Sequence, residues 1–266
     1  MKLAGRSVVV AGASAGIGAA MAEEAARRGA RAVGLLARRA ERLEQTAERV
    51  RAAGSQPHAV RVDLSDHEAV ARAADELRSG VVGVPDVIVH SSGAGRWRFI
   101  QETSAEEFVQ ANQAPYFATY FLARAFVDDF VARGSGVHAI VNTPVSRTPW
   151  PGAIGYASSR WALRGLTEAL RADLHGSGID VVEIVPAEVT TEYFADDPGG
   201  YKRIPRIAKL AGTISADRCA ADALEGLERG RAVVHTPRRW RALAVAGAMN
   251  PWMTKRMMIL TGAKRP

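Results

Sequence analysis

Short apolar runs alternate with longer amphipathic segments along most of the chain. The runs are rich in β-branched residues, which predicts strands at residues 7–10, 31–36, 58–62, 87–90, 137–141, 179–185 and 232–235. Between them, apolar residues recur at helical spacing, which predicts helices at residues 17–28, 40–53, 66–79, 105–132, 156–175 and 217–228. Such alternation is typical of a parallel sheet covered on both faces, so we predict a doubly wound α/β fold of about seven strands.

Polar residues and one proline indicate where two of these helices begin or bend. Ser65 with Glu68, and Ser104 with Glu107, have the spacing of a capping box at a helix N-terminus. Pro115 lies inside the helix that follows Ser104. It must kink or restart that helix, because proline has no N–H to donate.

Two segments fall outside the alternation. Residues 142–155 predict an irregular loop, and residues 186–214 predict a longer one that is rich in Gly, Pro and charge. A connection of that length is typical of a lid, which we place at about residues 192–214. The lid side chains expected to shape a pocket are Tyr193, Phe194, Tyr201 and Ile207. We find no internal repeat or linker, so residues 1–237 predict one domain and residues 238–266 a C-terminal tail.

Composition bounds the class of protein. Hydrophobic residues make up 47% of the 266 residues, which is enough for a large core. Cys219 is the only cysteine, so an intrachain disulfide is excluded and no metal site is predicted. No apolar run of about 18 residues is present, and the first residues are too few and too polar for a signal peptide. The expected location is the cytoplasm.

The net charge of +7 is concentrated in the tail. Residues 231–266 hold eight Lys and Arg and no Asp or Glu, which leaves 27 basic against 28 acidic residues elsewhere. No reading element for nucleic acid is visible, so no nucleic-acid partner is expected. Apolar residues are interleaved with these charges. The tail therefore either packs over the domain or against a partner subunit, which we favour, or makes peripheral contact with a membrane.

The first strand runs into a glycine-rich turn, SVVVAGASAGIG at residues 7–18. Gly12, Gly16 and Gly18 allow positive φ and bring the backbone close to a bound group. The helix that follows presents free N–H groups, which suit an anion such as a pyrophosphate. An ordinary strand–helix turn is the alternative, since a glycine triplet alone is weak evidence.

Arginines follow the second strand, and small residues follow the fourth. In a dinucleotide-binding fold, Arg38 and Arg39 would lie at the adenosine ribose, where arginine accommodates a 2′-phosphate. This favours NADP(H) over NAD(H), the alternative being a solvated arginine pair. The loop at residues 91–95 lies where ligands bind in parallel sheets, beyond the carboxyl ends of the strands.

Taken in order, these segments resemble the short-chain dehydrogenase/reductase family over about residues 5–237, which implies a Rossmann-like fold. The resemblance rests on AGASAGIG (11–18), ARR (37–39), VDLSD (62–66), SSGAG (91–95), the helix with Asn112, YASSR (156–160) and PAEVTT (186–191). It implies that cofactor contacts come from Gly12, Ser14, Gly16, Ile17, Gly18, Arg38, Arg39, Asp63, Leu64, Ser92, Gly93, Ala94, Gly95, Tyr156, Arg160, Pro186, Val189 and Thr191.

The resemblance also implies the catalytic groups. Tyr156 corresponds to the catalytic acid/base; a free phenol has a pKa of about 10 and needs a nearby cation to act near neutral pH. Arg160 stands where the family has Lys. It supplies a permanent charge one helical turn away but cannot pass on a proton, so a relay would run elsewhere, through water at Asn112. The catalytic Ser corresponds to Thr143, with Ser146 as the alternative, because the loop is shortened.

Three further positions depart from the pattern: Ser92 and Gly93 replace two Asn residues, and Ala187 replaces a Gly. The expected function is an NADP(H)-dependent oxidoreductase that interconverts a small-molecule carbonyl and a secondary alcohol, working as a homodimer or homotetramer. The alternative, motivated by Arg160, is a protein of the same fold with weak or no redox activity, such as a cofactor-binding sensor or scaffold.

Overall fold

The computed structural model describes residues 1–93, 95–194 and 197–265. Within them, seven parallel strands form the main sheet, in the order β3-β2-β1-β4-β5-β6-β9. The strands are β1 (Ser7–Ala11), β2 (Ala32–Ala37), β3 (Gln56–Arg61), β4 (Val87–His90), β5 (Gly136–Val141), β6 (Ile179–Pro186) and β9 (Val233–Thr236). The doubly wound α/β fold predicted from the hydrophobic pattern is confirmed, with strand boundaries within about two residues of those expected.

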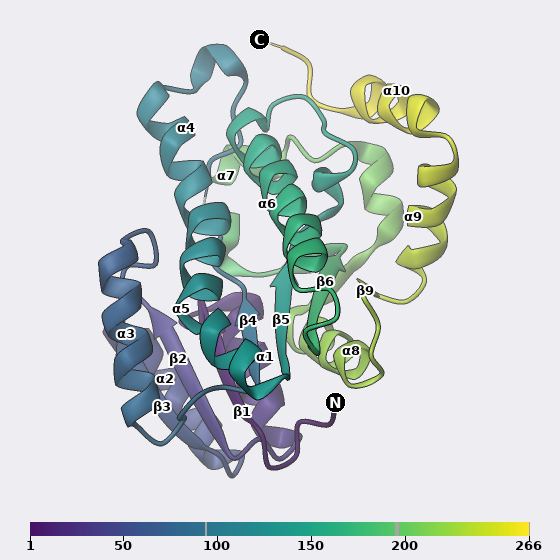
Figure 1. The fold of residues 1–266 in the computed structure, drawn as a ribbon. Coiled ribbons are helices and arrows are strands. Elements are labelled where there is room, and N and C mark those ends of the chain that lie inside the picture. Colours follow the sequence, from purple (N-terminus) through teal and green to yellow (C-terminus); the bar gives the residue numbers. More distant parts are fainter. Residues whose placement is uncertain (94, 195–196, 266) are drawn as a thin grey trace.

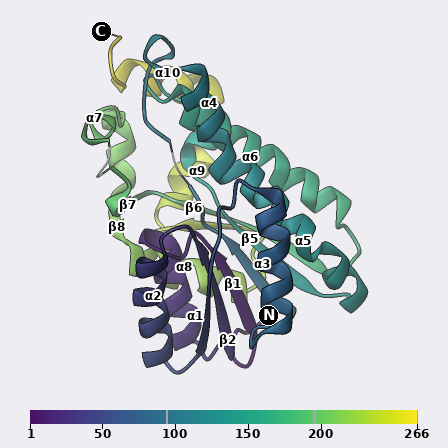
Figure 2. The same ribbon diagram turned by 90° about the vertical axis from the view of Figure 1, so that its left-hand side faces the viewer.

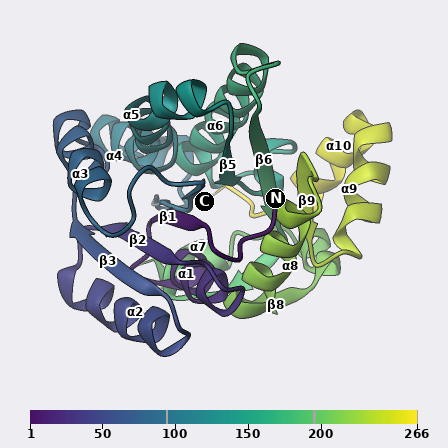
Figure 3. The same cartoon turned by 60° about the horizontal axis from the view of Figure 1, so that its bottom comes forward.

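Helices cover both faces of this sheet (Figure 3). They are α1 (Gly16–Arg27), α2 (Ala40–Ala52), α3 (His67–Ser79), α5 (Ala118–Arg133), α6 (Ile154–Asp173) and α8 (Ala216–Glu228). One core cluster joins α1, α2 and α8 to the sheet and includes Met21, Leu43 and Leu224. The other joins α3, α5 and α6 to the opposite face and includes Leu77, Phe126 and Leu163. Because both faces are buried, the strands are continuous apolar runs rather than alternating ones.

The carboxyl ends of the strands meet at one edge of the sheet, the upper edge in Figure 1. The strand order reverses between β1 and β4, where ligands bind in folds of this kind. The chain above this edge includes α4 (Ala105–Asn112), η1 (Ile100–Glu102) and η3 (Pro144–Ser146). A ligand-binding site is therefore expected at this edge.

Two expected helix boundaries have different outcomes. The capping box of Ser104 and Glu107 is confirmed, since the Ser104 hydroxyl accepts from the Glu107 N–H. The capping box assigned to Ser65 is wrong: Asp66 caps α3 by accepting from the N–H groups of Glu68 and Ala69. The Ser65 hydroxyl instead donates to the Asp63 carboxylate at 2.7 Å.

Pro115 does not end its helix. It lies in a π-helical turn, η2 (Gln113–Phe117), that joins α4 to α5. The extra residue in a π turn accommodates the missing proline N–H without a break in the helical path.

The long segment expected to be irregular contains several short elements. They are β7 (Glu188–Thr190), η4 (Glu192–Phe194), α7 (Pro198–Tyr201), η5 (Arg206–Ala211) and β8 (Thr213–Ser215). β7 and β8 pair in parallel as a small second sheet. In Figure 2, α7 lies at the same end of the molecule as α4, and β7 and β8 lie below α7.

The tail forms two helices, α9 (Trp240–Met249) and α10 (Pro251–Thr261). They flank the sheet beside β9, and α10 lies at the end where the strands terminate (Figure 1). In the part of the chain that the structure describes, no helix combines the length and the apolar character that crossing a membrane requires.

Candidate active site

A cavity of about 1380 Å³ lies at the carboxyl edge of the sheet. Every cofactor contact implied by the family resemblance lines it, except Ala94, which lies outside the described residues. The residues that line it are Gly12, Ser14, Gly16, Ile17, Gly18, Arg38, Arg39, Asp63, Leu64, Ser92, Gly93, Gly95, Tyr156, Arg160, Pro186, Val189 and Thr191. Positions spread over most of the chain thus converge on one space.

The glycine turn after β1 is built so that no side chain fills it. Gly12 has φ of +82°, and a Cβ there would lie 2.8 Å from the Ser91 carbonyl oxygen. A Cβ on Gly18 would overlap the Gly12 carbonyl. The N-terminal residue Ala15 provides no side-chain cap for α1, so the first N–H groups of that helix have no side-chain acceptor at its cap. A phosphate fits a helix N-terminus of this kind.

Charged groups surround the end of the cavity beside β2 and the glycine turn. Arg38 is exposed, and no ion pair or hydrogen bond involves its guanidinium within residues 1–93, 95–194 and 197–265. Arg39 donates to the Ser14 hydroxyl at 3.3 Å. The N–H and hydroxyl of Ser65 hold the pKa of Asp63 below its ordinary value by hydrogen bonding to its carboxylate. This end therefore offers one guanidinium with no partner and one carboxylate kept ionised.

Tyr156 and Arg160 occupy one face of α6. Tyr156 lies in the first turn, is 9% exposed, and its hydroxyl bonds to no described residue. The Arg160 guanidinium carbon lies 5.1 Å from the centre of the Tyr156 ring. Arg160 is 6% exposed and donates from Nη1 to the Val141 carbonyl at 3.2 Å. No carboxylate in the described residues pairs with this guanidinium, so its charge stays directed at the cavity.

Two departures from the family pattern meet in space. A Cβ built on Gly93 would overlap Nη2 of Arg160 and would lie 3.5 Å from the guanidinium carbon. The wider head group of Arg, which replaces the usual Lys, therefore occupies the volume that a side chain at position 93 would need. The absence of a side chain at Gly93 accommodates the presence of arginine at position 160.

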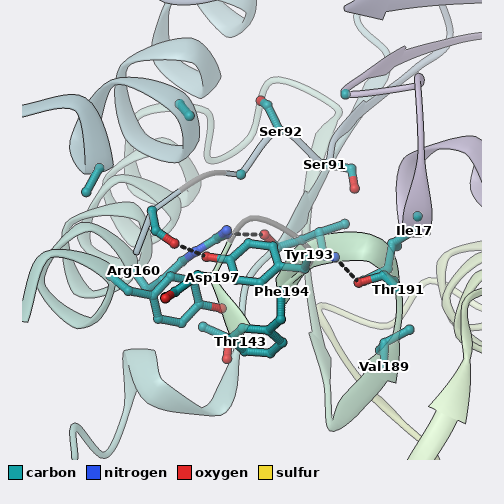
Figure 4. A pocket seen from close by; sticks show the side chains of 18 of the residues that line it. Ile17, Ser91, Ser92, Thr143, Arg160, Val189, Thr191, Tyr193, Phe194 and Asp197 are labelled. Carbon is teal, nitrogen blue, oxygen red and sulfur yellow. Dashed lines mark hydrogen bonds between the residues drawn. The ribbon is translucent and has the colours of Figure 1, made fainter. Parts of the chain in front are cut away.

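The structure separates the two candidates for the catalytic Ser position. Thr143 follows β5 and lines the cavity, as Figure 4 shows. Ser146 is fully buried, donates to the Thr143 carbonyl at 2.6 Å, and does not line the cavity. Ser146 thus stabilises the loop on which Thr143 lies.

A buried ionic network holds the same loop. Glu183 of β6 is fully buried and pairs with Arg147, which follows η3. Asn142 donates to Glu183 at 3.0 Å and to the Arg160 carbonyl at 3.4 Å. The network ties the Thr143 loop to the helix that carries Arg160.

Asn112 does not take the place expected for it. Its side-chain amide donates to the Phe108 carbonyl of its own helix at 2.8 Å, and the residue does not line the cavity. The side chain of Asn112 is therefore not available for a proton relay at the cavity. The physical reason is the local hydrogen bond along α4, which turns the amide away.

Two tryptophans that the sequence did not single out, Trp97 and Trp150, form part of the remaining wall. The Trp97 ring lies 5.1 Å from those of Tyr156 and Phe194 and 5.5 Å from that of Trp150, measured between centres. The positions of Trp97 and Trp150 in the sequence follow no motif that would place them at this cavity. The tail contributes Trp240 and Met258.

The lid makes polar contacts to the loop that follows β4. Asp197 accepts from the Trp97 N–H at 2.9 Å and from Arg98 at 2.7 Å. The hydroxyl of Tyr193 donates to the Gly95 carbonyl at 3.1 Å, and burial raises the pKa of Tyr193 well above its ordinary value. In Figure 4, Tyr193 and Phe194 lie between Arg160 and Thr191.

The lid as a whole meets the expectation only in part. Tyr193 and Phe194 line the cavity, but Tyr201 and Ile207 do not. Tyr201 is 44% exposed, and its hydroxyl donates to the Glu188 carboxylate at 3.2 Å. Ala208 and Ala211 of η5 line the cavity in place of Ile207, and Ile204, which precedes η5, lines it as well.

Known proteins are similar to this chain in sequence. The family model of the short chain dehydrogenases matches residues 6–199. A 1-deoxy-11-beta-hydroxypentalenate dehydrogenase of Streptomyces exfoliatus is 34% identical over 194 residues, which span 72% of this chain and 70% of that protein. A 3-dehydrosphinganine reductase of Arabidopsis thaliana is 27% identical over 234 residues, spanning 86% and 70%.

Solved structures of short-chain dehydrogenases have the same fold as this chain. A short-chain dehydrogenase from Sphingobium yanoikuyae in complex with NADPH is 28% identical, with a TM-score of 0.76 over 93% of this chain and 94% of that one. A protein of the same kind from Burkholderia phymatum, in complex with NAD, has a TM-score of 0.83 over 100% and 99% at 21% identity, which shows the shared fold.

Proposed function

The chain belongs to the short-chain dehydrogenase/reductase family, and on that premise we propose that it is an NADP(H)-dependent oxidoreductase interconverting a carbonyl and a secondary alcohol. The observation that carries the proposal is the juxtaposition at one cavity of Tyr156, Arg160 and Thr143. The same cavity continues to the glycine turn and to Arg38.

The residues present fit a nicotinamide dinucleotide. The glycine turn and the N-terminus of α1 would hold the pyrophosphate, with Asp63 beside the adenosine. The Nε atom of Arg160 is buried without a partner, which suits a donor kept for a ribose hydroxyl. When bound, the cofactor supplies or accepts the hydride.

Tyr156 and Thr143 would act on the substrate oxygen. Their hydroxyl groups hold it by hydrogen bonds, and Thr143 polarises the carbonyl as an oxyanion donor would. In the reducing direction Tyr156 gives its proton to the developing alkoxide, and in the oxidising direction it takes the proton back. The positive end of α6 and the Arg160 charge both favour the phenolate that remains.

The proton then has to be replaced. Arg160 stays charged, and the amide of Asn112 is engaged within α4. Water that reaches the cavity is therefore the proposed source of the proton.

The preference for NADP(H) rests on Arg38. Its unpaired guanidinium at the adenosine end suits a 2′-phosphate, which it can bind through two parallel hydrogen bonds. The Sphingobium yanoikuyae neighbour, in complex with NADPH, supports the same choice.

We also propose where the protein acts and how its copies assemble. We place the protein in the cytoplasm, as one domain (residues 1–237) with a tail. A homodimer or homotetramer is supported by exposed apolar side chains on neighbouring helices α4, η2, α5 and α6. These are Phe108, Val109, Phe117, Tyr120 and Trp161.

Cofactor oxidation followed by NADPH absorbance across a panel of ketones tests the proposal. Tyr156→Phe should abolish turnover while NADPH binding stays intact. Tyr193→Phe is the matched control, because it removes a second phenol from the same cavity without removing the proposed acid. Full activity in Tyr156→Phe would exclude the mechanism.

One further outcome would point to the alternative function. NADPH binding without oxidation by any ketone, together with turnover that appears in Arg160→Lys, would indicate a cofactor-binding protein without redox activity.

A further inference from the structure

The two tail helices expose an unusual amount of apolar surface. α9 and α10 comprise 10 and 11 residues. They nevertheless hold eight of the 19 large apolar side chains that are exposed in the described residues. These are Leu243, Val245, Met249, Trp252, Met253, Met257, Ile259 and Leu260. We call this the tail surface; apolar exposure concentrated on two helices that contact each other marks an interaction site.

The tail helices pack on the protein through narrow faces. In α9 the less exposed residues are Trp240, Ala244 and Gly247, and in α10 they are Thr254, Met258 and Thr261. Those positions recur every three or four residues, so each helix presents one stripe to the protein. A helix on a water-facing surface would carry charge on its opposite side, whereas the opposite side here is mostly apolar.

The cations on these helices flank the apolar side chains. At 3.6 residues per turn, Trp252 and Ile259 fall in one line on the outer face of α10, with Lys255 on one side and Arg256 on the other. The Arg256 guanidinium lies 5.4 Å from the Trp252 ring centre. Neither Lys255 nor Arg256 makes an ion pair with any described residue, and residues 231–266 contain no acidic side chain.

The charge pattern distinguishes between possible occupants. A second copy placed symmetrically on this surface would offer Arg241, Lys255 and Arg256 no carboxylate from its own tail surface to pair with. A bilayer with anionic lipids supplies the opposite charge and an apolar layer for the intervening side chains. Amphipathic helices with cations and Trp, Leu or Ile on the exposed side lie in the interface of such membranes.

We propose that α9 and α10 dock the protein onto an anionic membrane surface, from which the cavity receives an apolar alcohol or ketone. The link to substrate is that Trp240 and Met258, from these same helices, line the cavity. The aromatic side chains of Trp97, Trp150 and Phe194 line the same cavity. The choice of substrate rests on the proposed function, whereas the docking does not.

Vesicle flotation without cofactor or substrate tests the docking by itself. The protein should float with vesicles of phosphatidylcholine and phosphatidylglycerol, not with phosphatidylcholine alone, and less at high salt. Trp252→Glu should weaken partitioning at least about tenfold. Lys255→Gln with Arg256→Gln should weaken it roughly fivefold for each charge removed.

Controls distinguish docking from general effects of mutation. Val81→Glu alters a side chain that is 46% exposed, close to the 47% of Met253, and should leave flotation unchanged where Met253→Glu reduces it. Circular dichroism checks that each variant folds. If Trp252→Glu does not fold, Ile259→Glu replaces it as the test variant.

Two results would overturn the docking: wild-type protein that stays unbound with phosphatidylglycerol vesicles, or a folded Trp252→Glu that floats as well as the wild type. If the wild-type protein forms an oligomer but binds no vesicles, and Trp252→Glu dissociates that oligomer, a second copy covers the tail surface instead. A wild-type protein that floats with the vesicles but reduces no ketone would count against the proposed function and not against the docking. If docking serves substrate delivery, Trp252→Glu should slow reduction of a long-chain ketone in vesicles but not of a short soluble one.

Discussion

The overlap between position 93 and Arg160 makes a prediction that can be checked by a double-mutant cycle. Gly93→Ala introduces a Cβ into the volume of the Arg160 Nη2 atom. That guanidinium is the flexible end of a side chain and can shift, but it is buried, and a shift disturbs the hydrogen bond that its Nη1 donates to the Val141 carbonyl. Overpacking of this kind costs about 1–3 kcal/mol.

The effect of Gly93→Ala on the free energy of unfolding should reverse its sign when Lys stands at position 160. Lysine has no Nη2 atom, so the new Cβ meets no overlap there. Gly93 does not have positive φ, so Ala can adopt its backbone conformation. A compatible Gly→Ala change stabilises a protein by about 0.4–1 kcal/mol through the unfolded chain. Gly93→Ala is therefore expected to destabilise the wild type and to stabilise Arg160→Lys slightly.

Urea denaturation of the four proteins, followed by circular dichroism, gives the coupling free energy, expected at about 1–3 kcal/mol or more. Melting temperatures should shift by about 2–4 °C for each kcal/mol. Gly165→Ala is the control: a Cβ there meets nothing within 4 Å, so its effect should be the same in both backgrounds. Equal effects of Gly93→Ala in both backgrounds would refute the idea that the two departures compensate each other.

Three further predictions follow from other parts of the structure. Arg38→Gln should raise the dissociation constant for NADPH about tenfold or more and leave that for NADH nearly unchanged, as measured by calorimetry; equal losses for both would contradict the 2′-phosphate assignment. Glu183→Ala leaves Arg147 without its buried partner, so the free energy of unfolding should fall by about 3–5 kcal/mol in urea titrations, and an unchanged midpoint would argue against the network. His90 and His138 are buried 3.2 Å apart, and burial lowers the pKa of His90 well below 6.5 and that of His138 to about 4. The unfolded chain therefore takes up protons that the folded chain does not, so stability should fall as pH drops from 6.5 towards 4, and His138→Leu should flatten this dependence.

The sequence determined the fold and the position of the site. Strands buried on both faces read as continuous apolar runs, so their number and limits were visible in the residue pattern. Residues that immediately follow strands β1, β2 and β4 had to gather at one sheet edge, because all strands of the sheet are parallel. The sequence alone therefore places the glycine turn and Arg38 at one cavity.

The sequence could not determine which side chains face that cavity. Thr143 and Ser146 are three residues apart on one short loop, and only the packing of that loop on Glu183 directs Thr143 to the cavity and buries Ser146. Asn112 stands at the family position, but a hydrogen bond within its own helix turns its amide away.

Contacts between distant parts of the chain were decided only by tertiary structure. Nothing in the spacing of Gly93 and Arg160 shows that the two departures touch, and nothing in the tail indicates that Trp240 and Met258 reach the cavity. Sequence periodicity reports the local face on which a residue lies, whereas a contact across the molecule depends on how those faces pack against one another.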